Sequence, residues 1–323
     1  MVHLTSAAIL TEQHRKVGEP GSGDEDCKVH ADRSSGPFVD PYMLTFRTLS
    51  NGIKQSIRHQ VVGMFNDPGK GETPVSRSAD ALFDPDSVAW RVHGDVASMM
   101  VGGIGSLLMQ MLHPSVLAGV WDHSNFRTDM HGRLRRTARF IAVTTYADRD
   151  LAQATMARVR RVHDHVSGTL PDDTAYHAND PALLAWVHVT EASSFLDAWI
   201  RYGEPAMSAA DQDQYFAEMA LIGRAMGADP VPTSRSQALA LIEEIRPQLR
   251  VDDRTRTVAR LIMNGSTTSL AAQAPRRLAV QAAVDLLPQW ARKMHRMSLS
   301  PLERPIVRAG TFGIAQTLRW AFK

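Results

Sequence analysis

A run of seventeen residues without a charged side chain, residues 96–112 (VASMMVGGIGSLLMQML), constrains the fold of this chain more than any other feature. A run of that length is close to the lower limit for crossing a membrane, so it forms either a membrane span or a helix buried within protein. It contains Ser98 and Gln110, and it lacks the aromatic and basic belts that flank membrane spans. We therefore expect a buried helix. Because 44% of the 323 residues are hydrophobic, the chain has enough apolar side chains to surround it.

Helical patterns fill most of the remaining sequence. No segment shows the sustained alternation of apolar and polar residues that marks strands, and Asn51 and Gly52 lie in a helical pattern rather than between strands. We expect an all-α fold, a single bundle of about eight to twelve helices. The patterns cover about 42–65, 132–147, 149–167, 181–202, 211–227, 234–246, 252–263, 275–296 and 301–321, and a short further helix is expected to open at Asp84 and Pro85.

Composition divides the chain into two parts. The first residues are rich in glycine, serine, proline and charge, so we expect a flexible tail over residues 1–36 and a helical domain over residues 37–323. The only cysteine, Cys27, rules out a disulfide framework and a Cys-x-x-Cys metal site. The N-terminus has no basic leader or small-residue cleavage site of the secretory kind, which predicts a cytoplasmic protein.

Charge does not identify a macromolecular partner. The chain has 36 basic and 34 acidic side chains, a formal net charge of +2, and neither sign forms long runs, so we expect no nucleic-acid binding. The C-terminal segment FGIAQTLRWAFK is amphipathic, mildly basic and contains Trp320 and Phe322. This composition is compatible with peripheral membrane contact.

One histidine lies among apolar residues on a predicted helix. In DRDLAQATMARVRRVHDHVSG, helical spacing puts His163 on the side of Met156, Val159, Val162 and Val166. The neighbouring His165 lies about 200° around the helix, so the two histidines do not chelate one metal ion. His163 is therefore either a core residue with a hydrogen-bond partner or a ligand.

A polar cluster precedes that helix. In GRLRRTARFIAVTTYA, Arg133, Arg136 and Thr137 are spaced so that two guanidinium groups and a hydroxyl share one helix face. Such a cluster could hold an anion, a propionate or a polar oxygen intermediate. The alternative is a solvated basic face anchored by surface acids.

Other candidate groups carry weaker signals. Asp122, His123 and His131 form a possible metal set in a segment whose spacing does not fix their geometry, and His113 and His188 lie in apolar surroundings where core packing is the default. No Glu-x-x-His, His-Glu-x-x-His or P-loop motif occurs, and the glycines of the uncharged run do not follow a strand. These absences argue against di-iron, zinc-protease, nucleotide and dinucleotide sites.

The succession DPDSVAWRVHGD, LLMQMLHPSVLAGVWDHSNF, GRLRRTARFIAVTTY, VRRVHDHVSG and YHANDPALLAWVHVTEASSFLDAW resembles the actinobacterial branch of the MpaB and rubber oxygenase (latex-clearing protein) catalytic-domain family. The resemblance covers roughly residues 80 to 300. It implies an all-helical fold enclosing a haem b pocket, with His163 as the axial iron ligand. It also implies a distal polar cluster of Arg133, Arg136 and Thr137, although rubber oxygenases have a lysine where Arg136 stands.

The leading hypothesis is a haem b-dependent oxygenase that uses dioxygen and a hydrophobic, unsaturated, isoprenoid-like small molecule. In this hypothesis neutral His163 holds the iron, and Arg133 with Thr137 stabilises bound oxygen or developing negative charge. The first alternative is a non-catalytic haem- or lipid-binding protein of the same fold. The second is a helical protein without haem, in which His163 is a plain core residue.

Overall fold

A computed structural model describes residues 41–67, 69, 71–265 and 270–323. It confirms the all-α class. The described residues contain thirteen α-helices, one more than the upper end of the expected range, and a single two-stranded sheet. The elements are α1 (Pro41–Phe65), α2 (Val88–His93), α3 (Val96–Gln110), α4 (Pro114–His123), α5 (Met130–Tyr146), α6 (Arg149–His163), β1 (Ser167–Thr169), β2 (Ala175–His177), α7 (Pro181–Tyr202), α8 (Ala209–Met226), α9 (Arg235–Ile245), the 3₁₀ helix η2 (Arg246–Gln248), α10 (Asp253–Asn264), α11 (Leu270–Leu286), α12 (Gln289–His295) and α13 (Glu303–Phe322).

The chain separates into a unit of residues 1–46 and a unit of residues 47–323. Of the first unit, the structure describes only the first residues of α1. The expected flexible tail, residues 1–36, therefore lies outside the described residues. The second unit contains every other element and all the candidate site residues.

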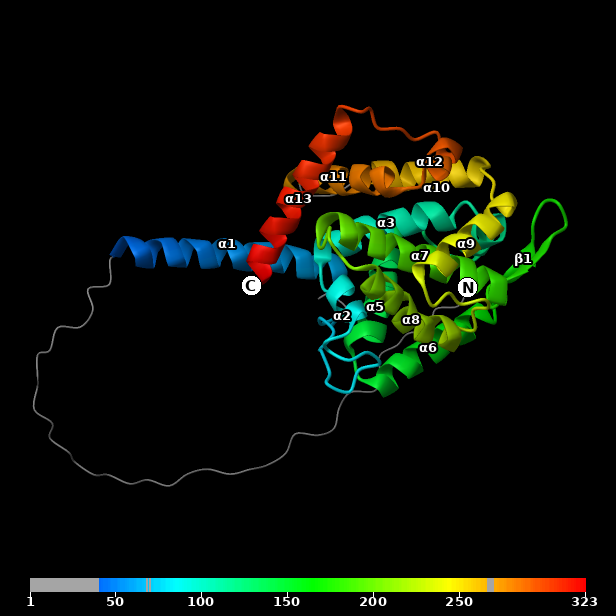
Figure 1. Cartoon of the computed structure of the whole chain (residues 1–323), viewed down its shortest axis with the longest axis horizontal. Coiled ribbons are helices and arrows are strands. Elements are labelled where there is room, and N and C mark those ends of the chain that lie inside the picture. Colours follow the sequence, from blue (N-terminus) through cyan, green and yellow to red (C-terminus); the bar gives the residue numbers. More distant parts are fainter. Residues whose placement is uncertain (1–40, 68, 70, 266–269) are drawn as a thin grey trace, which may run out of the picture. The chain divides into compact units, whose positions relative to one another are not determined.

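The uncharged run forms the buried helix α3, which packs against α7 at the centre of the second unit (Figure 1). Glycine makes this close approach possible: a Cβ atom on Gly102 would lie 2.7 Å from the Phe195 ring and 2.8 Å from the Ser194 carbonyl oxygen. Helices α11 and α13 also pack against α3. Burial from several sides explains why this sequence excludes charge.

No single helix among the described residues is long and apolar enough to span a membrane. Taken together, helices α3 and α4 are long and apolar enough for a membrane span, but the chain bends by 104° between them. The bend falls at His113, the N-cap of α4, which is followed by proline in the first turn.

Most helix starts follow the local capping chemistry expected from sequence. Ser208 begins α8 by accepting a hydrogen bond from the Asp211 backbone N–H. Asp180 begins α7 in the same way. The expected start at Asp84 and Pro85 is wrong, because these residues form a turn and Ser87 caps a helix that begins later, at Val88.

Two further expectations need correction. The helix expected over residues 149–167 ends at His163, and the chain continues into the antiparallel hairpin of β1 and β2. Three-residue strands are too short for alternation to reveal them. The helix expected over residues 275–296 is broken near Pro288, which becomes the N-cap of α12, because proline cannot donate the hydrogen bond a continuing helix needs.

Candidate functional site

His163 is the last residue of α6 and is half-buried. It shares the inward side of the helix with Met156 and Val159, whereas His165 is exposed, as the spacing predicts. Val162 departs from the expected pattern, since 57% of it is exposed. The helix therefore buries a narrow stripe and presents His163 at its end.

Two buried polar atoms without hydrogen bonds lie at His163: its own Nδ1 and the side-chain oxygen of Asn179. The Asn179 amide nitrogen is held by the Arg160 carbonyl at 3.0 Å and by the Asp164 carboxylate at 2.7 Å. Burial lowers the pKa of His163, and the Asn179 side chain and Asp164 only partly offset that effect. Asn179 thus lies close enough to act on the ring, but the two atoms are not aligned for a hydrogen bond.

This arrangement suits a metal-ligating imidazole. A neutral ring is the form that binds iron, and a small rotation would let Nδ1–H donate to the Asn179 oxygen. Nε2 would then remain available as a ligand. Sequence reasoning missed Asn179 because it lies sixteen residues away, beyond the β-hairpin.

Arg133, Arg136 and Thr137 lie together on the first turns of α5, which packs against α6. Arg133 donates to the Ser124 hydroxyl at 3.0 Å, and burial together with the nearby Arg136 lowers its pKa. Arg136 is exposed and lies 3.7 Å from the Asp129 carboxylate. The exposed Thr137 hydroxyl donates to the Arg133 carbonyl at 3.3 Å. Within the described part of the chain, no hydrogen bond or ion pair joins these three residues to His163.

Of the three, Arg133 has the most chemically distinctive environment. A half-buried guanidinium whose partner is a neutral hydroxyl keeps most of its charge available for an anion. Arg136 is partly neutralised by the acid that caps α5, because Asp129 also accepts from the Gly132 backbone N–H at 2.8 Å. The hydroxyl of Thr137 is used within its own helix.

The middle of α7 carries a pair of ionisable residues that sequence reasoning did not connect. Burial lowers the pKa of His188 to about 4 and raises the pKa of Glu191 to about 7. His188 packs against α8, where a Cβ atom on Gly223 would lie 2.9 Å from its Nε2. Glu191 also helps to raise the pKa of Tyr215. A carboxyl that titrates near neutrality is suited to proton transfer, so Glu191 is a candidate acid or base.

A second buried histidine, His93, is fully paired. Its Nδ1 lies 2.8 Å from the Thr145 hydroxyl, and its Nε2 lies 2.9 Å from the Tyr215 hydroxyl. Burial lowers its pKa to about 3. A neutral histidine with both nitrogens in use is a structural residue rather than a vacant ligand.

Two members of the possible metal set are engaged in other interactions. Asp122 accepts from the Tyr176 hydroxyl at 3.0 Å and pairs with Arg254 at 3.3 Å. His123 Nε2 contacts the Ser167 carbonyl at 3.0 Å. Across the ranges that the structure describes, no three His, Cys, Asp or Glu side chains are grouped to hold a metal ion. A haem iron needs only one protein ligand, so this result concerns bare metal ions alone.

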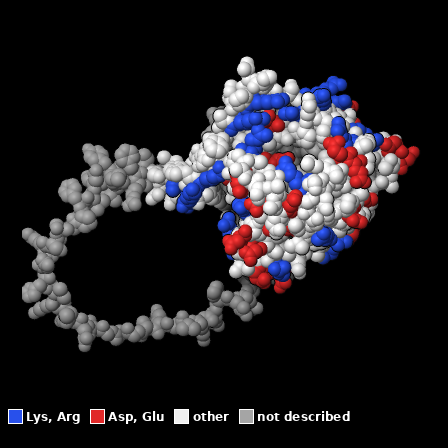
Figure 2. Space-filling view, viewed as in Figure 1, with Lys and Arg blue, Asp and Glu red and all other residues white. Residues whose placement is uncertain are grey.

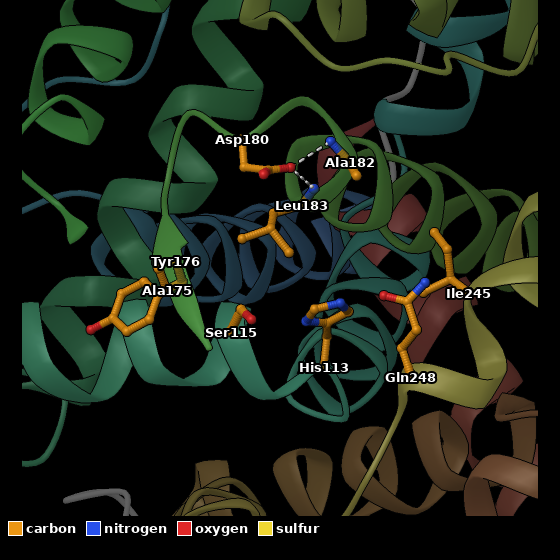
Figure 3. Close-up of a pocket in the computed structure, with 9 residues that line it drawn as sticks. All are labelled: His113, Ser115, Ala175, Tyr176, Asp180, Ala182, Leu183, Ile245 and Gln248. Atoms are coloured by element: carbon orange, nitrogen blue, oxygen red, sulfur yellow. Dashed lines mark hydrogen bonds between the residues drawn. The ribbon is translucent and has the colours of Figure 1, made fainter. Parts of the chain in front are cut away.

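A cavity of about 200 Å³ lies at the N-termini of α4 and α7. It falls below the range of roughly 300–1,000 Å³ that is usual for sites holding drug-sized ligands, so it is not a haem pocket. Figure 3 shows the lining residues, which are His113, Ser115, Ala175, Tyr176, Asp180, Ala182, Leu183, Ile245 and Gln248.

The family model of the ER-bound oxygenase mpaB/B'/rubber oxygenase catalytic domain matches residues 90–320. No curated protein and no solved structure matches the chain. The matched region runs from α2 into α13 and contains His163, Asn179, Arg133 and Glu191. Because it covers most of the sequence, the chain belongs to the MpaB and rubber oxygenase catalytic-domain family, a family of oxygenases.

Proposed function

We propose that this protein is a haem b-dependent oxygenase that acts on a hydrophobic, unsaturated small molecule. Membership of the family supports an oxygenase that uses dioxygen and a small-molecule substrate. The observation that supports haem as the cofactor is the pair of buried atoms without hydrogen bonds at His163 and Asn179. An unpaired buried polar atom is costly, and a small rotation of the ring would pair Nδ1 with the Asn179 oxygen and leave Nε2 to bind the iron.

The residues present fit a haem in their donor chemistry. His163 would supply one neutral imidazole nitrogen to the iron, and Asn179 would fix the orientation of the ring through Nδ1. Haem, when bound, would supply the activation of dioxygen. The protein supplies orientation, electrostatics and exclusion of water.

Four other residues have proposed roles in the chemistry. The Arg133 guanidinium would stabilise negative charge that develops on an oxygen atom, since its environment leaves it largely uncompensated. Arg136 and Thr137 would assist from the same helix face. Glu191 would accept or return a proton, because its carboxyl changes state near neutral pH.

The decisive experiment compares His163→Ala with His165→Ala, which changes an exposed histidine on the same segment. Pyridine haemochrome assays and absorption spectra are recorded on wild type and both variants from haem-supplemented cells. We expect a Soret band in wild type and His165→Ala and its loss in His163→Ala. An unchanged spectrum in His163→Ala would contradict the proposed ligand. Absence of haem from wild type would favour the alternative of a helical protein that binds no haem.

A non-catalytic haem- or lipid-binding protein is the remaining alternative. It would bind haem through His163 but consume no oxygen. Oxygen uptake measured with a panel of isoprenoids, sterols and fatty acids separates it from the oxygenase. Turnover that depends on His163 and Glu191 would support the oxygenase.

We also propose that the protein is cytoplasmic and contacts a membrane through α13. Leu302, Ile306 and Trp320 are 82%, 69% and 41% exposed, and their spacing puts them on one side of the helix. The buried Asp285 nearby is surrounded by more positive charge than it can neutralise, and Figure 2 shows Lys and Arg gathered on this side of the molecule. The arginines around Asp285 are Arg292, Arg304 and Arg308, at 3.9, 3.8 and 2.7 Å.

An exposed apolar stripe beside a basic cluster suits an anionic lipid surface. Flotation with phosphatidylcholine vesicles, with and without phosphatidylserine, measures the contact. Ile306→Ser should weaken binding by about tenfold or more, because about 2 kcal/mol of apolar burial is lost. Leu239→Ser, which changes an exposed leucine on α9, is the control. Equal binding by both variants, or none by wild type, would contradict the proposal.

A further inference from the structure

The cavity beside His113 has the features of a built ligand site rather than of a packing defect. It lies where two helices begin, with His113 at the N-cap of α4 and Asp180 at the N-cap of α7. Its volume of about 200 Å³ exceeds the roughly 150 Å³ of an engineered cavity that binds benzene in another protein. The site therefore has room for one ring and a polar group.

His113 supplies a hydrogen-bonding atom without a partner inside this space. The residue is only 6% exposed, and its Nδ1 is buried without a hydrogen bond. Figure 3 shows the amide oxygen of Gln248 on one side of the ring, and the other ring nitrogen directed toward Ser115 and Leu183. Nδ1 therefore needs a partner from the ligand, which accepts or donates according to the tautomer of the ring.

The start of α4 supplies the complementary donors. His113 makes no side-chain cap, and Pro114 has no N–H, so the backbone N–H and hydroxyl of Ser115, which lines the cavity, are available as donors. Asp180 instead caps α7, and its carboxylate accepts from Ala182 and Leu183 at 2.9 and 3.2 Å. The N-terminus of α7 is thus capped by a carboxylate, whereas the N-terminus of α4 has no side-chain cap.

Charge and shape then select the class of ligand. The Asp180 carboxylate on the cavity wall disfavours a second carboxylate, whereas a neutral group that both donates and accepts satisfies His113 and Ser115 together. Leu183 and Ile245 provide apolar contacts for the rest of the molecule. We propose that this cavity binds a small alcohol or carboxamide with a single-ring apolar body.

The test uses three probes of matched shape: benzyl alcohol, benzamide and benzoate. The ¹⁵N signal of His113 Nδ1 in the full-length protein reports binding at the proposed atom, and it requires no haem. We expect benzyl alcohol or benzamide to shift that signal to saturation, with benzoate at least about tenfold weaker because of Asp180. Failure of haem binding by His163 would leave this result unaffected.

Two variants locate the binding without disturbing the core. Ala182→Trp places a large side chain at the cavity wall and should abolish the shift, whereas Ala210→Trp, at an exposed alanine early in α8, should retain it. Three results would overturn the proposal: no shift with any probe, as expected for a cavity that holds only water; equal binding of benzoate; or binding that survives in Ala182→Trp.

Discussion

Replacing Glu191 by glutamine should remove one contribution to the pH dependence of the free energy of unfolding. In the folded protein, burial raises the pKa of this carboxyl from 4.5 to about 7. Below pH 4.5 the group is protonated in both the folded and unfolded states. As the pH rises, the unfolded state releases the proton first, so the folded state loses stability until the pH passes about 7.

The magnitude follows from the pKa difference. A rise from 4.5 to about 7 is about 2.5 pH units, which at about 1.4 kcal/mol per unit corresponds to about 3 kcal/mol. Glutamine has nearly the same shape but does not ionise. The free energy of unfolding of Glu191→Gln minus that of wild type should therefore increase by about 3 kcal/mol between about pH 4 and about pH 9.

Urea unfolding followed by circular dichroism across this pH range measures the difference. Contributions from His93 and His188 are common to both proteins and cancel. Glu243→Gln, which changes an exposed glutamate on α9, controls for the loss of one acidic side chain. A difference between wild type and Glu191→Gln that stays constant within about 0.5 kcal/mol would refute the desolvation argument and remove the basis for Glu191 as the proton-transfer group.

Three other results are expected. Gly102→Ala should destabilise the protein by about 1–3 kcal/mol in thermal unfolding, because the added Cβ atom would meet Phe195 and the backbone. Gly103→Ala, whose added Cβ atom would have its nearest neighbour at 3.8 Å, should be neutral or slightly stabilising. Equal effects of the two substitutions would contradict the close packing of α3 on α7. Asn179→Leu should weaken haem binding about tenfold to hundredfold in a haem titration, and unchanged affinity would remove its positioning role. Burial lowers the pKa of His93 to about 3, so the free energy of unfolding of wild type minus that of His93→Gln should fall in urea unfolding as the pH drops from about 6.5 toward 3; the opposite contribution of Glu191 is common to both proteins, and a constant difference would contradict the burial of His93.

Local sequence determined the class of the fold and several of its elements. The uncharged run required burial, and it became α3 at the centre of the bundle. The positions of Met156 and Val159 relative to His163 follow from helical periodicity alone. The family was also accessible from sequence, because its motifs occur in order along the chain and the match covers residues 90–320. In each case the information lies within one helix or in the order of segments.

Sequence was less informative where elements end. The end of α6 at His163 and the break at Pro288 separate helices that periodicity had joined. Periodicity persists across a break when the residues on both sides are apolar at compatible positions, so it does not mark the boundary. The short β-hairpin after α6 escaped notice because its strands, at three residues each, carry too little pattern.

The chemistry of the candidate sites was decided by tertiary structure. Asn179 comes to His163 because a β-hairpin turns the chain back, and the cavity collects His113, Asp180 and Gln248 from three separate parts of the sequence. The pKa of Glu191 depends on how much protein surrounds it, which no neighbour in sequence reports. Sequence specifies which groups are available within each helix, whereas desolvation and hydrogen bonding act through space, and only the packed fold fixes them.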